Sequence, residues 1–421
     1  MKKWIRTVCA GALLAGALTV SAFAADFTSC ADHLKEMNLF QGTGDGYALD
    51  RAPTRGEAAA MLVRLLGREQ QAKALDYTAP FTDLAGWQKP YVQYLYEHDL
   101  TRGVSETSFA PEDGCTAQMY AAFLLRALGY SEQDGDFTYR STLDFAEKIG
   151  LYDAYTVDEA DFRRGHLAAA SYTALSITPK DGQGTLLDQL VRSGAVERTA
   201  AAPYQKLFSD YARYRSATAG MDSLHALSLR QELKVDAERL AMRSQETISV
   251  DLAASVSLTE RVATMSAPGA KDKTFTAESY TAGGFRYLKQ DGVRSRRALT
   301  AEQQRLAFAG YARLPVAMIE TMSVSPAGSY TFTYDAQGLV LLDEMLDAAR
   351  AAVGGFDGME ISGLTVTQSA AGGKIASQKV GFSFAADDIA GTVQSETKLL
   401  ATDDAVAVTA PSNLEQYPLV Q

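Results

Sequence analysis

A block of sequence returns within the first half of the chain, and it constrains the fold more than any other feature. Thr54-Arg55-Gly56-Glu57 leads into an apolar run that ends at Gly67, and Thr116-Ala117-Gln118 leads into a similar run that ends at Gly129. The two copies lie 62 residues apart. Because repeated units of this kind bury their apolar faces against their neighbours, the first half is predicted to be a small helical array.

A short amphipathic helix is predicted ahead of each second helix, and a third copy emerges from this pattern. The three short helices end at Asn38-Leu39, Asp99-Leu100 and Gly150-Leu151. Asn, Asp and Gly best tolerate the left-handed conformation that closes a helix. With the second helix of the third copy over 162–172, three helix–loop–helix units are predicted over residues 26–178.

The middle copy carries the fullest motif, and its residues resemble those of the S-layer homology family. Repeats of that family open their second helix with Thr-Arg-x-Glu, which the first copy keeps at 54–57. In the middle copy Ala117 stands in place of the Arg, and the third copy keeps Arg164. The motif of the middle copy comprises Phe81-Thr82-Asp83, Trp87, Gly103-Val104 and Phe109-Ala110-Pro111. On this resemblance the repeats span residues 25–70, 78–132 and 136–178.

The resemblance implies attachment to a cell wall. Three such repeats pack about a pseudo-threefold axis, and grooves between them hold an acidic, often pyruvylated, secondary cell-wall polysaccharide. An Arg guanidinium is a planar fork of donors that matches a carboxylate. The positions carried over as glycan-binding are Arg55, Arg164, Asp83, Trp87 and Gly103.

Two of these assignments have structural alternatives. Thr54 followed three residues later by Glu57 is also the pattern of a capped helix start, so Arg55 can belong to a folding signal. Trp87 either packs in the core, which is the first expectation, or offers a flat face to a sugar ring.

The N-terminus predicts export. Lys2, Lys3 and Arg6 form a basic segment, an apolar run follows over 8–20, and Ala22-Phe23-Ala24 is a small-x-small cleavage site. Residues 1–24 are therefore predicted to be a signal peptide, too short for a transmembrane anchor. The mature chain is expected to have no transmembrane segment and to lie at the wall or surface of a Gram-positive type of bacterium.

Charge and cysteine content narrow the partners. The chain has 51 acidic and 40 basic side chains and a formal net charge of −11. Such a surface repels nucleic acid, so no nucleic-acid partner is expected, and an acidic wall polymer needs a local basic groove or bridging cations. Cys30 and Cys115 remain after processing, either as a disulfide, which export permits, or as two buried thiols.

The pattern changes after residue 178. A turn-rich break precedes a helical stretch from Leu186 to Ala219, which is expected to restart at Pro203. Residues 179–202 are assigned to a linker and helix, and residues 203–421 to an α+β domain with one curved antiparallel sheet. Period-two alternation predicts strands over 227–235 and 248–252 and, later, at 256–258, and further strands over 329–334, 360–367, 374–384 and 392–401, with helices near 301–313 and 339–353. Asp291-Gly292 predicts a hairpin turn.

The order of these elements is similar to that of the half-barrel lipoprotein-carrier superfamily. This resemblance is one of architecture, and it implies a curved sheet around an apolar groove that takes an amphipathic ligand. Arg294, Arg296 and Arg297 form the basic cluster of this region. They are either a solvated hairpin face or the contact for an anionic head group.

Recognisable catalytic motifs are missing from the sequence. The four histidines lack H-x-x-x-H spacing, and neither G-x-S-x-G nor C-x-x-C occurs. No catalytic residue, metal or cofactor is therefore assigned. The predicted function is a secreted surface protein that is anchored to wall polysaccharide and displays a ligand-binding or sensor-like domain. The alternatives are an enzyme that degrades wall or other polymers, with carboxylates from distant strands, and a purely structural surface protein.

Overall fold

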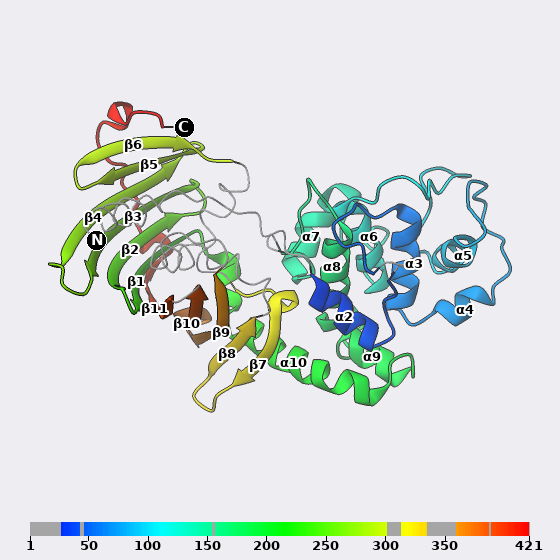
Figure 1. Cartoon of the computed structure of the whole chain (residues 1–421). Helices are drawn as coiled ribbons and strands as arrows, with labels where there is room; N and C mark the ends of the chain where they lie inside the picture. Colours follow the sequence, from blue (N-terminus) through cyan, green and yellow to red (C-terminus); the bar gives the residue numbers. More distant parts are fainter. Residues whose placement is uncertain are drawn as a thin grey trace. The chain divides into compact units, whose positions relative to one another are not determined.

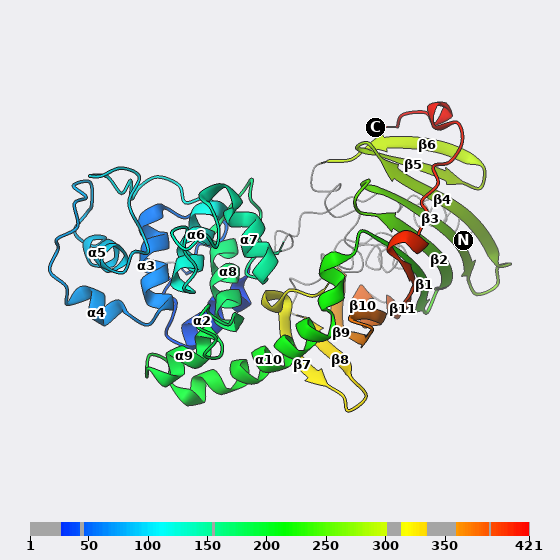
Figure 2. The same cartoon turned by 180° about the vertical axis from the view of Figure 1, so that it is seen from behind.

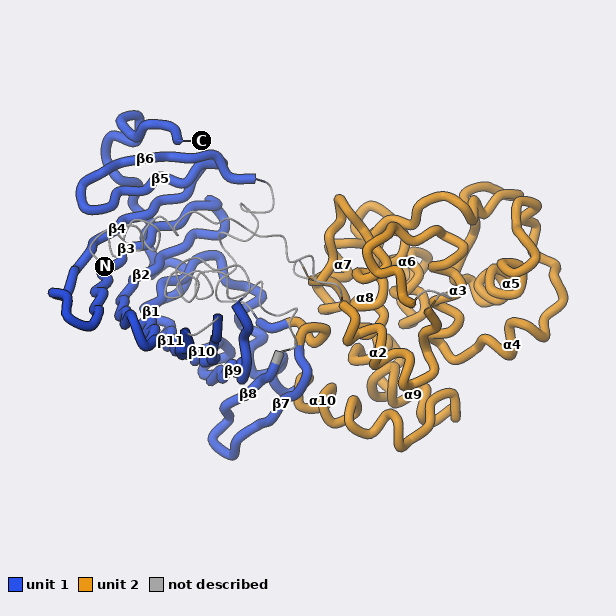
Figure 3. The backbone as a smooth tube through the Cα atoms, viewed as in Figure 1, with its two compact units in different colours: residues 1–23, 213–314, 319–421 blue, residues 24–212, 315–318 orange. Residues whose placement is uncertain are grey.

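The computed structural model describes residues 27–42, 46–153, 156–300, 313–334, 359–386 and 389–420. The predicted signal peptide 1–24 lies outside these ranges, as do the predicted helices near 301–313 and 339–353, apart from Arg313. The described residues form two compact units (Figure 3). We call residues 27–212 with Pro315–Met318 the helical unit, and the described residues from Arg213 to 314 and from Ile319 onward the sheet unit.

The helical unit contains the predicted pairs of helices (Figure 1). The first helices of the pairs are α2 (Thr28–Glu36), α5 (Lys89–Glu97) and α7 (Thr142–Ile149). The second helices are α3 (Arg55–Leu65), α6 (Ala117–Ala127) and α8 (Arg164–Ser176). A short helix, α4 (Glu69–Lys73), lies between the first two pairs, and α9 (Leu186–Arg192) and α10 (Arg198–Ala217) follow the third.

The predicted left-handed helix ends are confirmed. Asn38, Asp99 and Gly150 have φ angles of 63°, 56° and 75°, so each copy closes its first helix in the same way. The leucine that follows is buried in every copy, at Leu39, Leu100 and Leu151. The turn thus directs an apolar side chain back into the core.

The repeated apolar blocks form the centre of the helical unit. Helices α3, α6 and α8 pack on one another in all three pairings, and Leu62, Leu124 and Ala169 are almost completely buried. Between α6 and α8, the Tyr120 hydroxyl lies 2.6 Å from the Ser171 hydroxyl. This pairing satisfies two polar groups that would otherwise be buried without partners.

Helix α10 differs from the prediction at its start. It begins at Arg198, so Pro203 lies inside the helix instead of in its first turn. Three consecutive alanines before Pro203 explain the extra turn, since alanine has the highest helix propensity. Farther along α10, Tyr204 and Phe208 pack edge-on against Tyr172. The helical unit therefore extends beyond the boundary predicted at residue 203.

The sheet unit is built on eleven described strands that are antiparallel throughout (Figures 1 and 2). The first wing contains β1 (Ala226–Ala237), β2 (Leu240–Asp251), β3 (Val256–Ser266), β4 (Lys273–Ala282), β5 (Phe285–Gln290) and β6 (Val293–Ala298). The second contains β7 (Ile319–Val324), β8 (Ser329–Tyr334), β9 (Glu360–Ala371), β10 (Lys374–Ala386) and β11 (Ile389–Thr402). The strand order is β6-β5-β4-β3-β2-β1-β11-β10-β9-β8-β7. The first and last strands therefore meet in the middle.

The sequence predicted most of these strands. The strand at Ser329–Tyr334 has the expected bounds, and Asp291 and Gly292 adopt positive φ angles of 47° and 87° in the predicted hairpin turn. Strands β4 and β7 were not predicted, because their residues mix polar and apolar types without clear alternation. The coarse fold class, helices followed by an antiparallel sheet, is confirmed.

The two faces of the sheet differ in chemistry. On the buried face, Leu227, Leu229 and Val250 form a core cluster with Ile375. A row of polar side chains crosses the same face next to this cluster. It includes the hydrogen-bonded pairs Gln368–Gln378 (2.7 Å) and Thr397–Gln231 (3.2 Å) and the ion pair Arg261–Glu246 (2.6 Å). The lipoprotein-carrier resemblance implies an apolar groove, whereas the buried face of this sheet also carries a row of polar side chains.

The left-handed helix ends give a stability prediction. Replacing Gly150 by Ala should lower the free energy of unfolding by about 1–2 kcal/mol, because a Cβ is unfavourable in this conformation. Replacing Asp99 by Gly is the matched control and should leave stability equal or slightly higher. Thermal and denaturant unfolding of both variants measure this, and equal destabilisation by both would contradict it.

Candidate functional site at the helix starts of the repeats

The second helix of each repeat begins at a capped residue. At α3 the Thr54 hydroxyl accepts the Glu57 N–H (3.2 Å), and the Glu57 carboxylate accepts the Thr54 N–H (3.0 Å). Thr116 caps α6 through its hydroxyl alone. At α8 the ring Nδ1 of His166 accepts the Arg163 N–H (3.1 Å). The alternative reading of the Thr-x-x-Glu pattern as a helix start is therefore correct, and His166 takes the place of the Glu.

Arg55 joins the start of α3 to the loop of the next repeat. The Arg55 N–H donates to the Asp113 carbonyl (2.9 Å). The neighbouring Gly56 N–H donates to the Pro111 carbonyl (2.8 Å). The side chain is buried, donates from Nε to the Phe109 carbonyl (2.9 Å) and lies over the Phe109 ring at 4.8 Å. Loop 109–113 is thereby fixed on the first turn of the helix.

Arg164 repeats this arrangement at the start of α8. Its N–H donates to the Arg51 carbonyl (2.9 Å). The Gly165 N–H donates to the Leu49 carbonyl (2.9 Å). The buried side chain donates from Nε to the Tyr47 carbonyl (3.0 Å). The third repeat thus binds loop 47–51 of the first repeat. In the same way, the first repeat binds loop 109–113 of the second repeat.

The helix start of the middle repeat has a different contact. Ala117 is buried, and its carbonyl accepts a hydrogen bond from the Tyr152 hydroxyl at 2.9 Å. Tyr152 belongs to the third repeat. This position therefore also faces the next repeat, but a buried tyrosine supplies the contact and no guanidinium is present.

The two arginines differ in their electrostatic surroundings. Burial lowers the pKa of both guanidinium groups. Asp113 and Asp83 are among the groups that oppose the shift at Arg55, and Glu57 opposes it at Arg164. The distance from Arg164 to the Glu57 carboxylate is 3.6 Å. Among the described residues no carboxylate lies within ion-pair distance of Arg55. A desolvated cation without an anionic partner gains most from an incoming carboxylate.

Asp83 and Gly103 shape the loop that Arg55 holds. The Asp83 carboxylate accepts the N–H groups of Phe109 (3.0 Å) and Ala110 (2.8 Å) and the Ser108 hydroxyl (2.6 Å). Burial alone would raise the pKa of Asp83, but these donors outweigh it and lower the pKa. Both residues support the loop.

Gly103 cannot be replaced without moving that loop. Its φ is +75°, and an added Cβ would lie 2.4 Å from the Phe81 ring and 2.6 Å from the Ser108 carbonyl. The position therefore requires glycine for backbone and steric reasons. Any glycan contact at Asp83 or Gly103 remains a prediction.

Trp87 lies at the surface. Its side chain is 51% exposed, and its ring meets Tyr91 edge-on at 6.5 Å between centroids. The expectation that Trp87 packs in the core is therefore wrong. The other reading, a flat face open to a sugar ring, is compatible with this exposure.

A second recurring arginine was not singled out from the sequence. Arg64 and Arg126 occupy the same place in the repeated block and bind Glu69 (3.1 Å) and Glu132 (3.2 Å) through Nε. The Glu69 carboxylate is partly buried, but the Tyr91 hydroxyl, Lys73 and Arg64 lower its pKa to about 2. An acidic residue five or six positions after each arginine was the signal for this pair.

The three arginines of the sheet unit do not share one face. In β6 the side chains alternate, so Arg294 and Arg296 lie opposite Lys289 and Tyr287, and Arg297 lies on the other face opposite Arg286. Arg294 also donates to the Gln416 side chain (2.8 Å). One anionic head group therefore cannot meet all three.

Neither a metal site nor a disulfide is present among the residues that the structure describes. No group of three or more His, Cys, Asp or Glu side chains there could hold a metal ion. Cys30 and Cys115 are two separate buried thiols, which answers the question that the sequence left open. None of the described helices is long and apolar enough to cross a membrane.

Known proteins are similar to parts of this chain. Residues 80–116 match the family model of the S-layer homology domain. The chain is 28% identical over 195 residues to the "Middle cell wall protein" of Brevibacillus brevis, covering 42% of this chain and 18% of that protein. It is 32% identical over 146 residues to the "Surface layer protein" of Brevibacillus choshinensis, covering 31% and 13%.

An enzyme is also among the relatives. The "Endoglucanase" of a Bacillus species is 32% identical over 71 residues, which cover 16% of this chain and 8% of that protein. The chain thus spans less than a fifth of the length of each of these relatives. The domain match and the surface-protein relatives indicate a secreted protein associated with the cell wall, as the sequence predicted.

The cap at His166 gives a prediction of pH dependence. Burial lowers the pKa of His166, with Asp158 and Asp161 opposing the shift. The ordinary pKa of histidine is about 6.5. When the pH falls below that value, His166 therefore binds a proton more readily in the unfolded chain than in the folded chain. Stability contributed by neutral His166 should be complete above that pH and should fall as the pH drops below it.

Replacing His166 by Gln should flatten this dependence, because Gln can also accept at the third helical position. The control is His225→Gln at an exposed histidine of the sheet unit. Denaturant unfolding between about pH 7.5 and 5 measures the effect. An unchanged slope in the His166 variant would contradict the assigned cap.

Proposed function

We propose that the helical unit anchors the protein to an acidic secondary cell-wall polysaccharide through three S-layer homology repeats. The observation that carries the proposal is the identical seating of Arg55 and Arg164, combined with the family match in the repeat between them. In each case a buried guanidinium lies where a helix start meets the loop of another repeat.

A pseudo-threefold arrangement of the repeats is supported by the order of these contacts. The helix start of the first repeat holds a loop of the second, and that of the third holds a loop of the first. The helix start of the second faces Tyr152 of the third. The relation therefore runs from each repeat to the next and returns to the first, as rotation about one axis requires.

Arg55 and Trp87 are the strongest candidates for contact with the polymer. Arg55 is desolvated, and its side-chain hydrogen bonds to described residues go to the neutral Phe109 carbonyl and Met119 sulfur, which suits a ligand carboxylate. Trp87 is exposed and belongs to the same middle repeat as loop 109–113, which Arg55 holds. Arg164 should contribute less, since Glu57 already faces it.

The sheet unit is proposed to be a displayed ligand-binding domain. Two observations support this proposal. The described strands form one broad antiparallel sheet, and the sequence contains no recognised catalytic motif. A polymer-degrading enzyme is the second candidate. It has less support, because the enzyme relative is similar over a short segment only.

The exposed tryptophan provides the cleanest test of anchoring. Full-length mature protein should sediment with purified wall sacculi, and Trp87→Ala should weaken this binding several-fold without changing thermal stability. Leu400→Ala in the sheet unit, which removes a comparably exposed apolar side chain, should bind as the parent does. Unchanged sedimentation of the Trp87 variant would remove Trp87 from the site.

The arginines should rank in a definite order. Arg55→Ala should weaken binding about 10- to 150-fold, since a hydrogen-bonded contact to a charged group contributes about 1.5–3 kcal/mol. Arg164→Ala should have a smaller effect, and Ala117→Arg should change binding least. Sedimentation isotherms measure the order, with circular dichroism as the control for folding. Normal binding by a folded Arg55→Ala variant would leave Arg55 with a structural role alone.

A further inference from the structure

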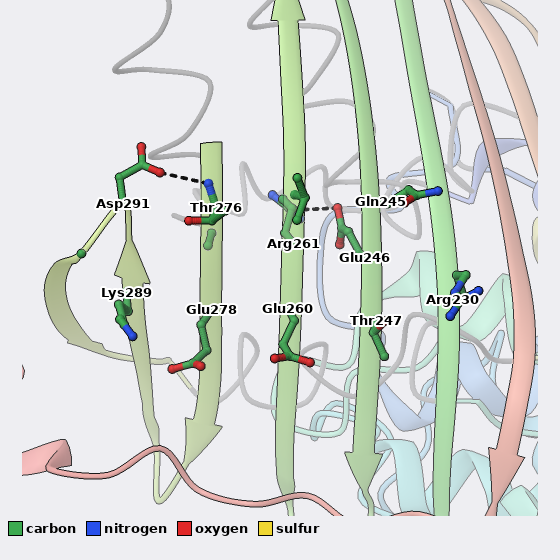
Figure 4. A pocket seen from close by; sticks show the side chains of 13 residues that line it. Arg230, Gln245, Glu246, Thr247, Glu260, Arg261, Thr276, Glu278, Lys289 and Asp291 are labelled. Atoms are coloured by element: carbon green, nitrogen blue, oxygen red, sulfur yellow. Dashed lines mark hydrogen bonds and ion pairs between the residues drawn. The ribbon is translucent and has the colours of Figure 1, made fainter. Parts of the chain in front are cut away.

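The open face of the sheet unit has a hollow of about 620 Å³ over strands β1 to β5 (Figure 4). Its floor is crossed by residues that stand opposite one another on successive strands, which we call the charged row. The members of the charged row are Lys289, Glu278, Glu260, Thr247 and Arg230. Along the row the formal charges are positive, negative, negative, neutral and positive.

Elsewhere on the open face, facing polar side chains bind one another. Strands β7 to β10 carry Ser and Thr pairs in hydrogen-bond contact, and charged neighbours also meet. The hydroxyl pairs are Ser369–Ser377 (2.6 Å), Thr331–Thr367 (3.1 Å) and Thr321–Thr333 (2.6 Å). The charged neighbours are Arg243–Asp236 (2.6 Å) and Lys398–Glu396 (3.3 Å). In these parts of the open face, polar side chains therefore have partners on the same strand or on the neighbouring strand.

The charged row is different. Its four charged side chains make no hydrogen bond or ion pair with any described residue, although Glu278 and Lys289 lie directly opposite each other. Glu260 and Glu278 also lie directly opposite each other, and like charges in that position destabilise a sheet. A cation bound between the two carboxylates would remove this repulsion.

The length of the charged row sets the size of a ligand. Neighbouring strands are about 4.8 Å apart, so Lys289 and Arg230 stand about 19 Å apart. The midpoint between Glu278 and Glu260 lies about 7 Å from Lys289 and about 12 Å from Arg230 on the same spacing. Beyond Lys289 the next cation, Arg294, is already held by Gln416.

We propose that this hollow binds an extended zwitterionic peptide, with one ammonium group over Glu260 and Glu278 and an anionic group at each end. The ends meet Lys289 and Arg230. Gln245, Thr247 and Thr276 also line the hollow, and their amide and hydroxyl groups can pair with peptide groups. This site is separate from the wall-anchoring residues.

A synthetic probe can reproduce the spacing. In an extended chain residues advance about 3.3 Å, so acetyl-Asp-Gly-Lys-Gly-Gly-Gly-Asp-amide places its lysine about 7 Å from one carboxylate and about 13 Å from the other. Titration of the full mature chain with this peptide should give saturable binding that weakens as salt is added. A peptide with Lys and Asp exchanged should not bind.

Variants locate the site and its orientation. Glu260→Gln with Glu278→Gln should weaken binding about tenfold or more, because the ammonium loses both charged partners. Lys379→Gln, on the open face of β10 outside the hollow, is the control and should bind normally. Lys289→Glu should lose the parent peptide and gain affinity for the peptide whose first Asp is replaced by Lys.

Four results would overturn the proposal. The first three are the absence of saturable binding by the parent peptide, equal binding of the charge-exchanged peptide, and unchanged binding by the folded double glutamine variant. Competition by a neutral glycan without ammonium groups would also contradict it. Trp87→Ala should leave peptide binding intact, so failure of wall anchoring and failure of this site can be told apart.

Discussion

The helical unit depends on the contact between a helix start and the loop of a neighbouring repeat. Backbone N–H groups in the first turn of a helix have no partner within that helix. At α3 and α8 two of them bind carbonyl groups of the neighbouring loop, and the first-turn arginine adds a third bond from Nε. This contact gives hydrogen-bond partners to N–H groups in the first turn of the helix and fixes the loop. It also leaves a guanidinium group between two repeats.

If Arg55 contacts the polymer as proposed, stability and binding share the same residues. Gly56 shows this constraint, because an added Cβ would lie 3.0 Å from the Gln88 side chain and 3.2 Å from the Pro111 carbonyl. Asp83 and Gly103 then give loop 109–113 its shape. A site built in this way is preorganised, since the groups around Arg55 are held by the fold before any polymer arrives.

The sequence predicted features that depend on local chemistry. Helix ends at Asn38, Asp99 and Gly150, the cap at Thr54 and the turn at Asp291-Gly292 follow from backbone preferences of single residues. It did not predict the start of α10, where the propensity of three alanines outweighs Pro203. It also misjudged Trp87, because a tryptophan next to an amphipathic helix gives no indication of which side will be covered.

Contacts between distant segments were beyond the reach of the sequence. The pairing of β1 with β11 and the alignment of Lys289 with Arg230 across five strands both depend on strand register. In the same way, Arg294 and Arg297 look like one cluster in the sequence but lie on opposite faces of β6. Charge clusters within a strand must therefore be divided by alternation before a site is assigned.

We expect the helical unit to recognise the acidic secondary polymer of the wall. The most direct measurement is sedimentation of the full mature chain with sacculi before and after chemical extraction of that polymer, leaving the peptidoglycan intact. Binding to untreated sacculi should be saturable, and it should be lost after extraction. Equal binding to extracted sacculi would contradict this expectation.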